Sequence, residues 1–281
     1  MKKTLTFLMM ITLCLCTLAQ STNSKGTTST TSSKNKKIEV NGVTFELVYV
    51  EGGSFIMGCT DEQFDCDEDE FDEDGNLRQI YLDGYYIATT EVTQAQWEAV
   101  MGTTIFDQME KYEYNRTFGA GINYPMYYVS WQEAMSFCQK LSNVTGETFI
   151  LPTEAQWEYA ARGGRNHDGN KYSGHNIIDL VAWYDDNSDW KTHPVASKRP
   201  NSLGLYDMSG NVWEMCYDWF YCWYLSNDTN NPAGSDYGRL RIQRGGSYTK
   251  IPRSCRVANR GCLYPYEVRM DTGFRIVMLP E

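Results

Sequence analysis

Residues 151–164 spell a helix with both ends marked: Leu151-Pro-Thr-Glu-Ala-Gln-Trp-Glu-Tyr-Ala-Ala-Arg-Gly-Gly164. Thr153 and Gln156 have the spacing of a capping box, in which two side chains satisfy backbone N–H groups at the helix start. The helix is expected to run through Ala160–Ala161. It should end at Gly163–Gly164, because glycine readily adopts the left-handed conformation that closes helices.

Outside this stretch the predicted elements are short. A second capping box, Ser130 with Glu133, begins a helix with one apolar face. A weaker helix is expected near residues 93–100. Short strands are expected at residues 45–50, 54–57, 80–87 and 274–278. Residues 165–266 should be mostly irregular, and so long a region needs cross-links from disulfides, a metal or dense hydrogen bonds.

Further motifs follow in order along the chain. Residues 53–58 are Gly-Ser-Phe-Ile-Met-Gly, 91–93 are Glu-Val-Thr, and 128–131 are Tyr-Val-Ser-Trp. Residues 201–214 are Asn-Ser-Leu-Gly-Leu-Tyr-Asp-Met-Ser-Gly-Asn-Val-Trp-Glu, 244–248 are Arg-Gly-Gly-Ser-Tyr, and 273–275 are Gly-Phe-Arg. With residues 151–164, this set resembles the formylglycine-generating enzyme, or sulfatase-modifying factor, family over about residues 45–279. The resemblance implies an α+β fold, the family's variant of the C-type-lectin fold, with low regular secondary structure. We expect this domain to span residues 38–281.

The resemblance also implies a copper site. The oxidases of that family convert a sulfatase cysteine to formylglycine with oxygen and a copper(I) ion held by two thiolates, which are soft ligands suited to Cu(I). Counting from Tyr248, the two thiolate positions are Lys250 and Cys255. A protonated lysine has no lone pair for the ion, so the copper pair is incomplete and orthodox chemistry is not expected. For Cys255 the alternatives are a buried or disulfide-bonded cysteine, or a catalytic thiol that Cys262 assists.

A calcium loop is the second implication of the resemblance. The carboxylates of Asp207 and Glu214 and the carbonyl groups of Gly210 and Val212 would ligate the ion. Closely spaced oxygen ligands suit Ca²⁺, whose role would be structural. The alternative is an ordinary capped loop whose carboxylates accept hydrogen bonds from backbone N–H groups.

Three residues fall where the family lines its substrate groove: Trp213, Ser247 and Arg244. Each has a scaffold alternative, as core for Trp213 and as loop hydrogen-bonders for the other two. The chain has three histidines, without the i, i+4 spacing of metal-binding helices and outside any nucleophile-like turn. The family's iron-dependent branch, zinc hydrolysis and a Ser–His–acid triad are therefore not expected.

Residues 1–19 have the features of a secretory signal peptide. Lys2 and Lys3 precede an apolar stretch at residues 5–18, and Thr17-Leu18-Ala19 provides a small-x-small cleavage site. The apolar stretch is too short for a stable membrane span. Residues 20–37 form a linker in which ten of eighteen residues are Ser or Thr. We expect an exported protein, periplasmic, cell-surface or secreted, with no membrane span.

Acidity is concentrated in one segment. The chain has 36 acidic and 25 basic residues, and ten of the acidic ones lie between Asp61 and Asp74 with no basic residue among them. This balance argues against nucleic acid as a partner. The run is expected to be a solvated, partly disordered loop.

Seven of the nine cysteines follow the signal peptide. Cys59–Cys66 and Cys216–Cys222 are close enough in sequence to be disulfide candidates in an oxidising compartment. An odd number leaves at least one thiol unpaired or joined to another molecule.

Two functions fit these observations. In the first, the chain is a non-catalytic binding or assembly module on a calcium-stabilised lectin-like scaffold, with a protein or glycan ligand. In the second, it is an oxidoreductase in which Cys255 still binds copper with Cys262 or an unforeseen ligand. Lys250 favours the first function, because an ammonium group stands where a thiolate is needed.

Overall fold

Each α-helix that the structure describes begins at a capping box. The computed structural model describes residues 35–167, 169–222 and 229–280, which belong to one compact unit, Ser33–Glu281. The helices are α1 (Gln94–Met101), α2 (Ile105–Lys111), α3 (Trp131–Thr145) and α4 (Glu154–Ala161). The boxes of Ser130 and Thr153 are confirmed. Helix α2 was not predicted, because its box joins Thr104 to Asp107 instead of to Glu or Gln.

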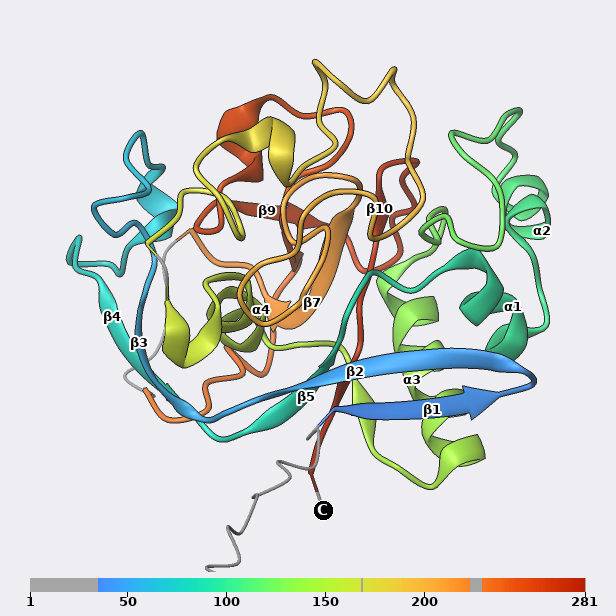
Figure 1. The fold of residues 1–281 in the computed structure, drawn as a ribbon, viewed down its shortest axis with the longest axis horizontal. Helices are drawn as coiled ribbons and strands as arrows, with labels where there is room; N and C mark the ends of the chain where they lie inside the picture. The colour runs from blue at the N-terminus through green and yellow to red at the C-terminus, as the bar shows by residue number, and fades with distance from the viewer. Residues whose placement is uncertain (1–34, 168, 223–228, 281) are drawn as a thin grey trace, which may run out of the picture. The chain divides into compact units, whose positions relative to one another are not determined.

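The larger sheet carries the N-terminal strands. Its order is β1 (Lys36–Val40), β2 (Val43–Val50), β5 (Tyr85–Ala88), β11 (Val277–Met278) and β6 (Phe149–Ile150). All its pairs are antiparallel. Strand β1 was not expected, since Lys36 and Lys37 were assigned to the linker. Helices α1 and α3 lie behind β1 and β2 in Figure 1, and a large core fills the space between them.

A second sheet carries several of the C-terminal motifs of the sequence. Its order is β10 (Thr272–Gly273), β7 (Trp213–Trp219), β8 (Arg241–Arg244) and β9 (Arg260–Leu263), with β10 parallel to β7. Strands β3 (Gly53–Met57) and β4 (Arg78–Leu82) form a separate pair. The 3₁₀ helices are η1 (Glu68–Glu70), η2 (Gly164–Asn166), η3 (Ile178–Leu180) and η4 (Pro252–Cys255). The α+β architecture and the largely irregular region after residue 165 are as predicted.

Two predicted strands are each broken in the structure. The strand expected at residues 80–87 is β4 and β5, which belong to different sheets. Asp83 and Gly84 separate the two strands, and a Cβ added at Gly84 would lie 2.2 Å from the Tyr49 hydroxyl, so a larger residue there would displace the tyrosine. The strand expected at residues 274–278 is reduced to β11. Arg275, which precedes β11, donates to the buried carboxylate of Glu214.

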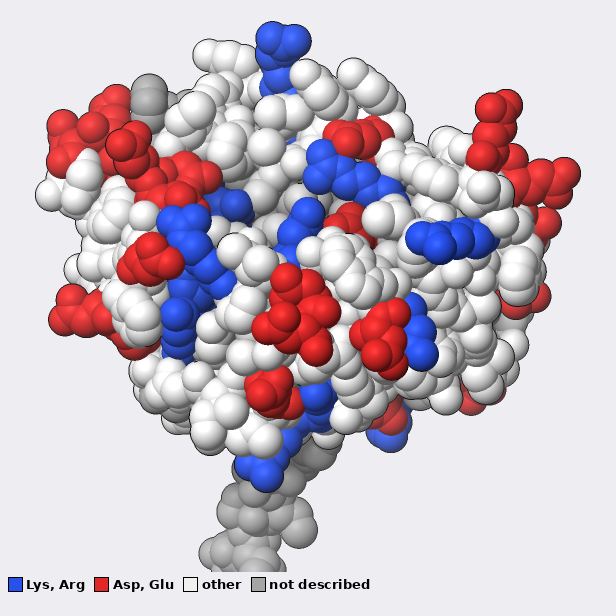
Figure 2. All heavy atoms as spheres, turned by 90° about the horizontal axis from the view of Figure 1, so that it is seen from above, with Lys and Arg blue, Asp and Glu red and all other residues white. Residues whose placement is uncertain are grey.

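The acidic run is partly solvated, as expected, but arginines hold several of its carboxylates, which corrects the expectation of partial disorder. It lies in the light-blue loop at the left of Figure 1, and carboxylates gather at the same edge in Figure 2, beside Lys and Arg side chains. Glu70 is fully buried and pairs with Arg256 through both carboxylate oxygens. Arg253 donates to Asp65 and Asp67. These arginines come from the segment that contains Cys255.

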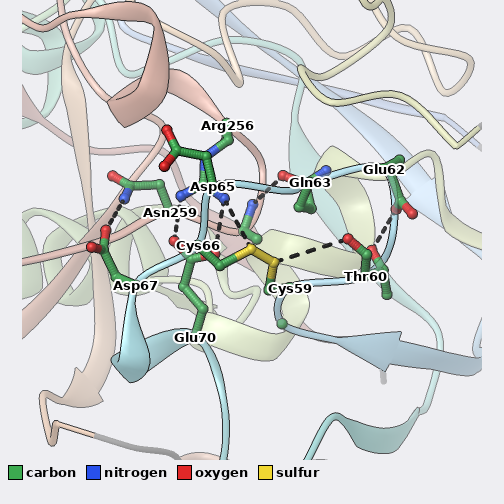
Figure 3. Close-up of a disulfide and its surroundings, with 12 residues drawn as sticks. Cys59, Thr60, Glu62, Gln63, Asp65, Cys66, Asp67, Glu70, Arg256 and Asn259 are labelled. Atoms are coloured by element: carbon green, nitrogen blue, oxygen red, sulfur yellow. Dashed lines mark hydrogen bonds and ion pairs between the residues drawn. A yellow bond between two sulfur atoms is a disulfide. The ribbon is translucent and has the colours of Figure 1, made fainter.

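One of the two predicted disulfides is confirmed. Cys59 and Cys66 are bonded, at the base of the acidic loop and beside the Arg256–Glu70 pair (Figure 3). The pairing of Cys216 with Cys222 is wrong, since both thiols are free. Cys216 points into the core from β7, whereas Cys222 is exposed beyond the strand.

The predictions for the N-terminus fall mostly outside the described residues. The signal peptide at residues 1–19 and most of the linker at residues 20–37 lie there, so both stay predictions. Within residues 35–280, apart from the gaps given above, no helix is long and apolar enough to cross a membrane.

Candidate functional site

The turn after β8 carries the Gly-Gly-Ser-Tyr motif. Ser247 is fully buried, and its hydroxyl donates to Oδ2 of Asp271 at 3.0 Å. Thr249 donates to the same oxygen at 2.7 Å. The Ser247 hydroxyl therefore has an acidic partner, Asp271.

Lys250 joins this polar group. Its ammonium nitrogen lies 3.9 Å from Oδ2 of Asp271, and its side chain is 41 % exposed. The backbone N–H of Lys250 donates to the carbonyl of Ser247, and its own carbonyl accepts from Asp185. The turn thus fixes the lysine backbone, while the carboxylate of Asp271 attracts the positive charge at its tip.

Cys255 ends η4 and is completely buried. It packs in a small core with Tyr172, Ala182 and Tyr184. Gly246 has φ 74°, and an added Cβ there would lie 2.7 Å from the Cys255 sulfur, so the glycine lets the turn close over the thiol. Burial raises the pKa of Cys255 to about 12, and the Asp185 carboxylate adds to the rise. The thiol is therefore shielded from solvent and, without a metal, less acidic than an ordinary cysteine.

Cys262 lies elsewhere. It is in β9 opposite Ile242, half-buried, and its charged neighbours include Arg269 and Asp69. Burial raises the pKa of this thiol too. Among the described residues, the clusters of three metal-binding side chains are Cys59/Cys66/Glu70 and Asp67/Asp69/Glu70. Neither cluster includes Cys255 or Cys262.

Trp213 and Arg244 are both buried. Trp213 begins β7, where it is 4 % exposed, and its indole nitrogen has no hydrogen-bond partner among the described residues. The Arg244 guanidinium is fully buried, contacts Glu158 and donates to the carbonyl groups of residues 257, 258 and 259. Arg244 thus cross-links the irregular C-terminal segment to α4.

The candidate calcium loop begins with the carboxylate of Asp207. Asp207 is buried, and its Oδ2 accepts from the N–H of Ala196 at 2.7 Å. Its Oδ1 is buried with no partner among the described residues. Burial raises the pKa of Asp207 to about 6, although the Ala196 hydrogen bond and the Arg275 charge act in the opposite direction. A buried oxygen without a partner fits a hard cation, so the Asp207 donor is suited to calcium.

Glu214 has a different environment. Its Oε2 accepts from the Trp157 indole at 2.6 Å and from the Arg275 Nε at 2.5 Å, and its Oε1 accepts from Arg275 at 2.6 Å. Both its oxygens therefore have partners within the protein.

Residues 31–279 match the family described as "Sulfatase-modifying factor enzyme 1-like domain". The chain belongs to this family. The family and the fold expected from the ordered motifs are thus confirmed. Within this sulfatase-modifying-factor domain, the two positions that the resemblance assigned to copper ligands are Lys250, paired with Asp271, and the buried Cys255.

Relatives of the domain include proteins described by different functions. The chain is 27 % identical to "Chaperone protein LppX" of Paenibacillus barcinonensis, covering 84 % of this chain and 90 % of that protein. It is 28 % identical to the formylglycine-generating enzyme of Thermomonospora curvata, covering 83 % and 93 %.

Solved structures support the same fold. "Treponema denticola variable protein 1" superposes with a TM-score of 0.73 at 28 % identity, covering 88 % of this chain and 99 % of that chain. PvdO from Pseudomonas aeruginosa gives 0.68 at 25 % identity, covering 84 % and 94 %.

Glu91 is a buried group that the sequence analysis did not single out. It lies just before the N-cap of α1 and is fully buried, and neither carboxylate oxygen has a partner among the described residues. Burial raises its pKa well above the usual value, and the nearby carboxylates of Asp207 and Glu214 raise it further. The available signal was its place in the Glu91-Val-Thr93 motif, two residues before the helix cap Thr93.

A groove of about 820 Å³ lies beside these residues. We call it the threonine groove, because its lining is rich in hydroxyl and amide groups. Its polar lining includes Thr44, Thr89, Thr90, Thr93, Gln96, Asn123 and Tyr206. Its volume is within the range of small-molecule sites.

Proposed function

We propose that this protein is an exported, non-catalytic binding or assembly module, built on a lectin-like scaffold that calcium stabilises at Asp207. The observation that carries the proposal is the chemistry of the two copper positions. One is an ammonium group 3.9 Å from the Asp271 carboxylate, and the other is the buried thiol of Cys255. The family's copper site needs two thiolates, and Lys250 leaves only one, so this donor set does not fit the ion. No catalytic step through copper is therefore derived.

The comparisons are compatible with a binding role. Identities of 27 % to a protein named as a chaperone and 28 % to a formylglycine-generating enzyme are nearly equal. Overall sequence identity therefore does not distinguish an assembly role from an oxidase activity. The choice rests on Lys250 and Cys255.

The threonine groove is the surface that we assign to the ligand. Its neutral polar side chains offer donors and acceptors to the hydroxyl groups of a glycan, and they lie beside apolar residues such as Phe45 and Leu203 and one carboxylate, that of Glu46. Thr89 and Asn123 lie on different segments of its lining. Replacing both, Thr89→Val with Asn123→Ala, should abolish retention on immobilised neutral oligosaccharides. Capture of a protein in place of any oligosaccharide would make the ligand a protein instead.

An oxidation assay tests the absence of catalysis. The mature protein is loaded with Cu(I), exposed to air and incubated with a cysteine-containing sulfatase-type peptide. Mass spectrometry should find the peptide cysteine unchanged. The formylglycine-generating enzyme of Thermomonospora curvata serves as the positive control. Conversion of the cysteine to an aldehyde by this protein would establish the alternative, an oxidoreductase with an unorthodox ligand set.

A further inference from the structure

The Cys59–Cys66 disulfide anchors the acidic run to α4. Gly58, directly before the first cysteine, donates its N–H to a carboxylate oxygen of Glu158 at 2.9 Å. The carbonyl of Gly58 accepts from Arg162, the C-cap residue of α4, at 2.6 Å. Cys66 lies within the acidic run, so the S–S bond ties this run to a fixed point of the chain.

The anchored loop binds residues 253–259, which we call the thiol segment because Cys255 lies in it. Gln63 lies inside the ring that the disulfide closes and is fully buried. Its side-chain oxygen accepts from the N–H of Ala258 at 3.2 Å, and its side-chain nitrogen donates to the carbonyl of Asn170 at 3.2 Å. The disulfide ring therefore holds the end of the thiol segment that follows the cysteine.

Further contacts from the loop lie on both sides of the buried cysteine. Asp67 accepts from Arg253 at 2.8 Å and from Asn259 at 3.4 Å. Nη1 of Arg256 lies 3.9 Å from the sulfur of Cys66 (Figure 3). The thiol segment is thus held before and after its cysteine by residues next to the disulfide.

The thiol segment encloses its own cysteine. Cys255 has no exposed surface, and it packs in a small core with Tyr172 and Tyr184. Its carbonyl accepts from the hydroxyl of Ser209 at 2.8 Å. A reagent in solvent therefore reaches the thiol only when the segment moves away from this core, and the loop contacts oppose that movement.

Charge favours opening of the loop, and the disulfide opposes it. The acidic run has ten carboxylates between Asp61 and Asp74 and no basic residue, so its members repel one another. Cys59 and Cys66 are both partly exposed, so a reductant reaches the S–S bond without unfolding of the domain.

From these contacts we infer that the Cys59–Cys66 disulfide is a redox-operated clamp, whose reduction frees the thiol segment and opens Cys255 to modification. A dithiol reductant attacks one sulfur, the S–S bond breaks, and the reductant leaves as its own disulfide. Two electrons and two protons pass to the two cysteines. The loop then samples more conformations, and the thiol segment opens more often. The clamp is independent of the ligand and the calcium ion in the proposed function.

Alkylation of the folded mature protein tests the clamp. The protein is treated with dithiothreitol, freed of it without air and exposed to iodoacetamide, and mass spectrometry gives the rate at each cysteine. Reduction should raise the rate at Cys255 at least tenfold over the oxidised protein. Cys138 and Cys216 are buried free thiols in the other two cores and are the matched controls, which should stay unreactive. The exposed Cys222 should react equally in both states.

The double variant Cys59→Ser/Cys66→Ser opens the clamp without a reductant and should show the same rise at Cys255. A rate at Cys255 that stays at the oxidised value in either the reduced wild type or this variant would overturn the inference. An equal rise at Cys138 and Cys216 would show general unfolding instead of a local opening, which also contradicts it.

Discussion

At the scale of single residues, buried arginines connect the irregular segments. Arg256 and Glu70 are both fully buried and joined by two hydrogen bonds. We expect Arg256→Ala to lower the free energy of unfolding by about 3–5 kcal/mol, because it leaves the Glu70 carboxylate buried without its counter-charge. Denaturant titration measures this change.

Arg253 provides the matched control for that variant. It lies three residues earlier, pairs with Asp65 and Asp67, and its side chain is 36 % exposed. Exposed pairs contribute little, so Arg253→Ala should cost at most about 1 kcal/mol. Equal losses in the two variants would contradict the distinction between the buried and the exposed pair.

The raised pKa of Asp218 predicts that the free energy of unfolding depends on pH. Burial, followed by the charge of Glu154, raises its pKa to about 7 in the folded protein from an ordinary value of 3.8. The folded state therefore binds this proton more tightly than the unfolded state does. The contribution of Asp218 is most favourable below about pH 4 and is lost as the pH rises towards about 7.

Asp218→Asn keeps an acceptor for the N–H of Glu154 and removes the titration. The variant should lose part of the decrease in the free energy of unfolding between about pH 4 and about pH 7. Denaturant titrations across this range measure the slope. An unchanged slope would show that Asp218 does not titrate as described.

At the scale of elements, the helices were easier to predict than the strands. The capping boxes of Ser130 and Thr153 are local signals, and both helices begin where these residues predict. Strand breaks depend on distant contacts. Gly84, between β4 and β5, packs against the Tyr49 hydroxyl, and Arg275, just before β11, donates to Glu214. Neither partner is visible from the sequence around the break.

The acidic loop offers a second test at this scale. Cys59 and Cys66 are seven residues apart, and closing so short a loop should stabilise the protein by about 2–3 kcal/mol. The double variant Cys59→Ser/Cys66→Ser should lose about this much in denaturant titration and become more sensitive to protease in the loop. Cys222→Ser, at an exposed free thiol, is the control and should change neither. Equal protease sensitivity of the two variants would mean that the arginines alone order the loop.

At the scale of the whole molecule, the ordered motifs predicted the family and fold, but only part of the candidate site. The resemblance indicated Asp207 and the Lys250 substitution directly. It did not reveal that Arg275 and Trp157 donate to Glu214, or that Glu91 is buried without a partner among the described residues. Those facts depend on how segments far apart in sequence pack together, and a linear motif carries no information on that packing.

The central claim is that Lys250 removes the copper site from a sulfatase-modifying-factor scaffold. A competitive Cu(I) titration under reducing, anaerobic conditions tests it most directly, with the wild type, Lys250→Cys and the double variant Lys250→Cys/Cys255→Ser side by side. We predict that the wild type and the double variant do not withdraw Cu(I) from the competing chelator, and that Lys250→Cys does, because it restores two thiolate positions. Copper binding by the wild type as tight as that of Lys250→Cys would contradict the claim.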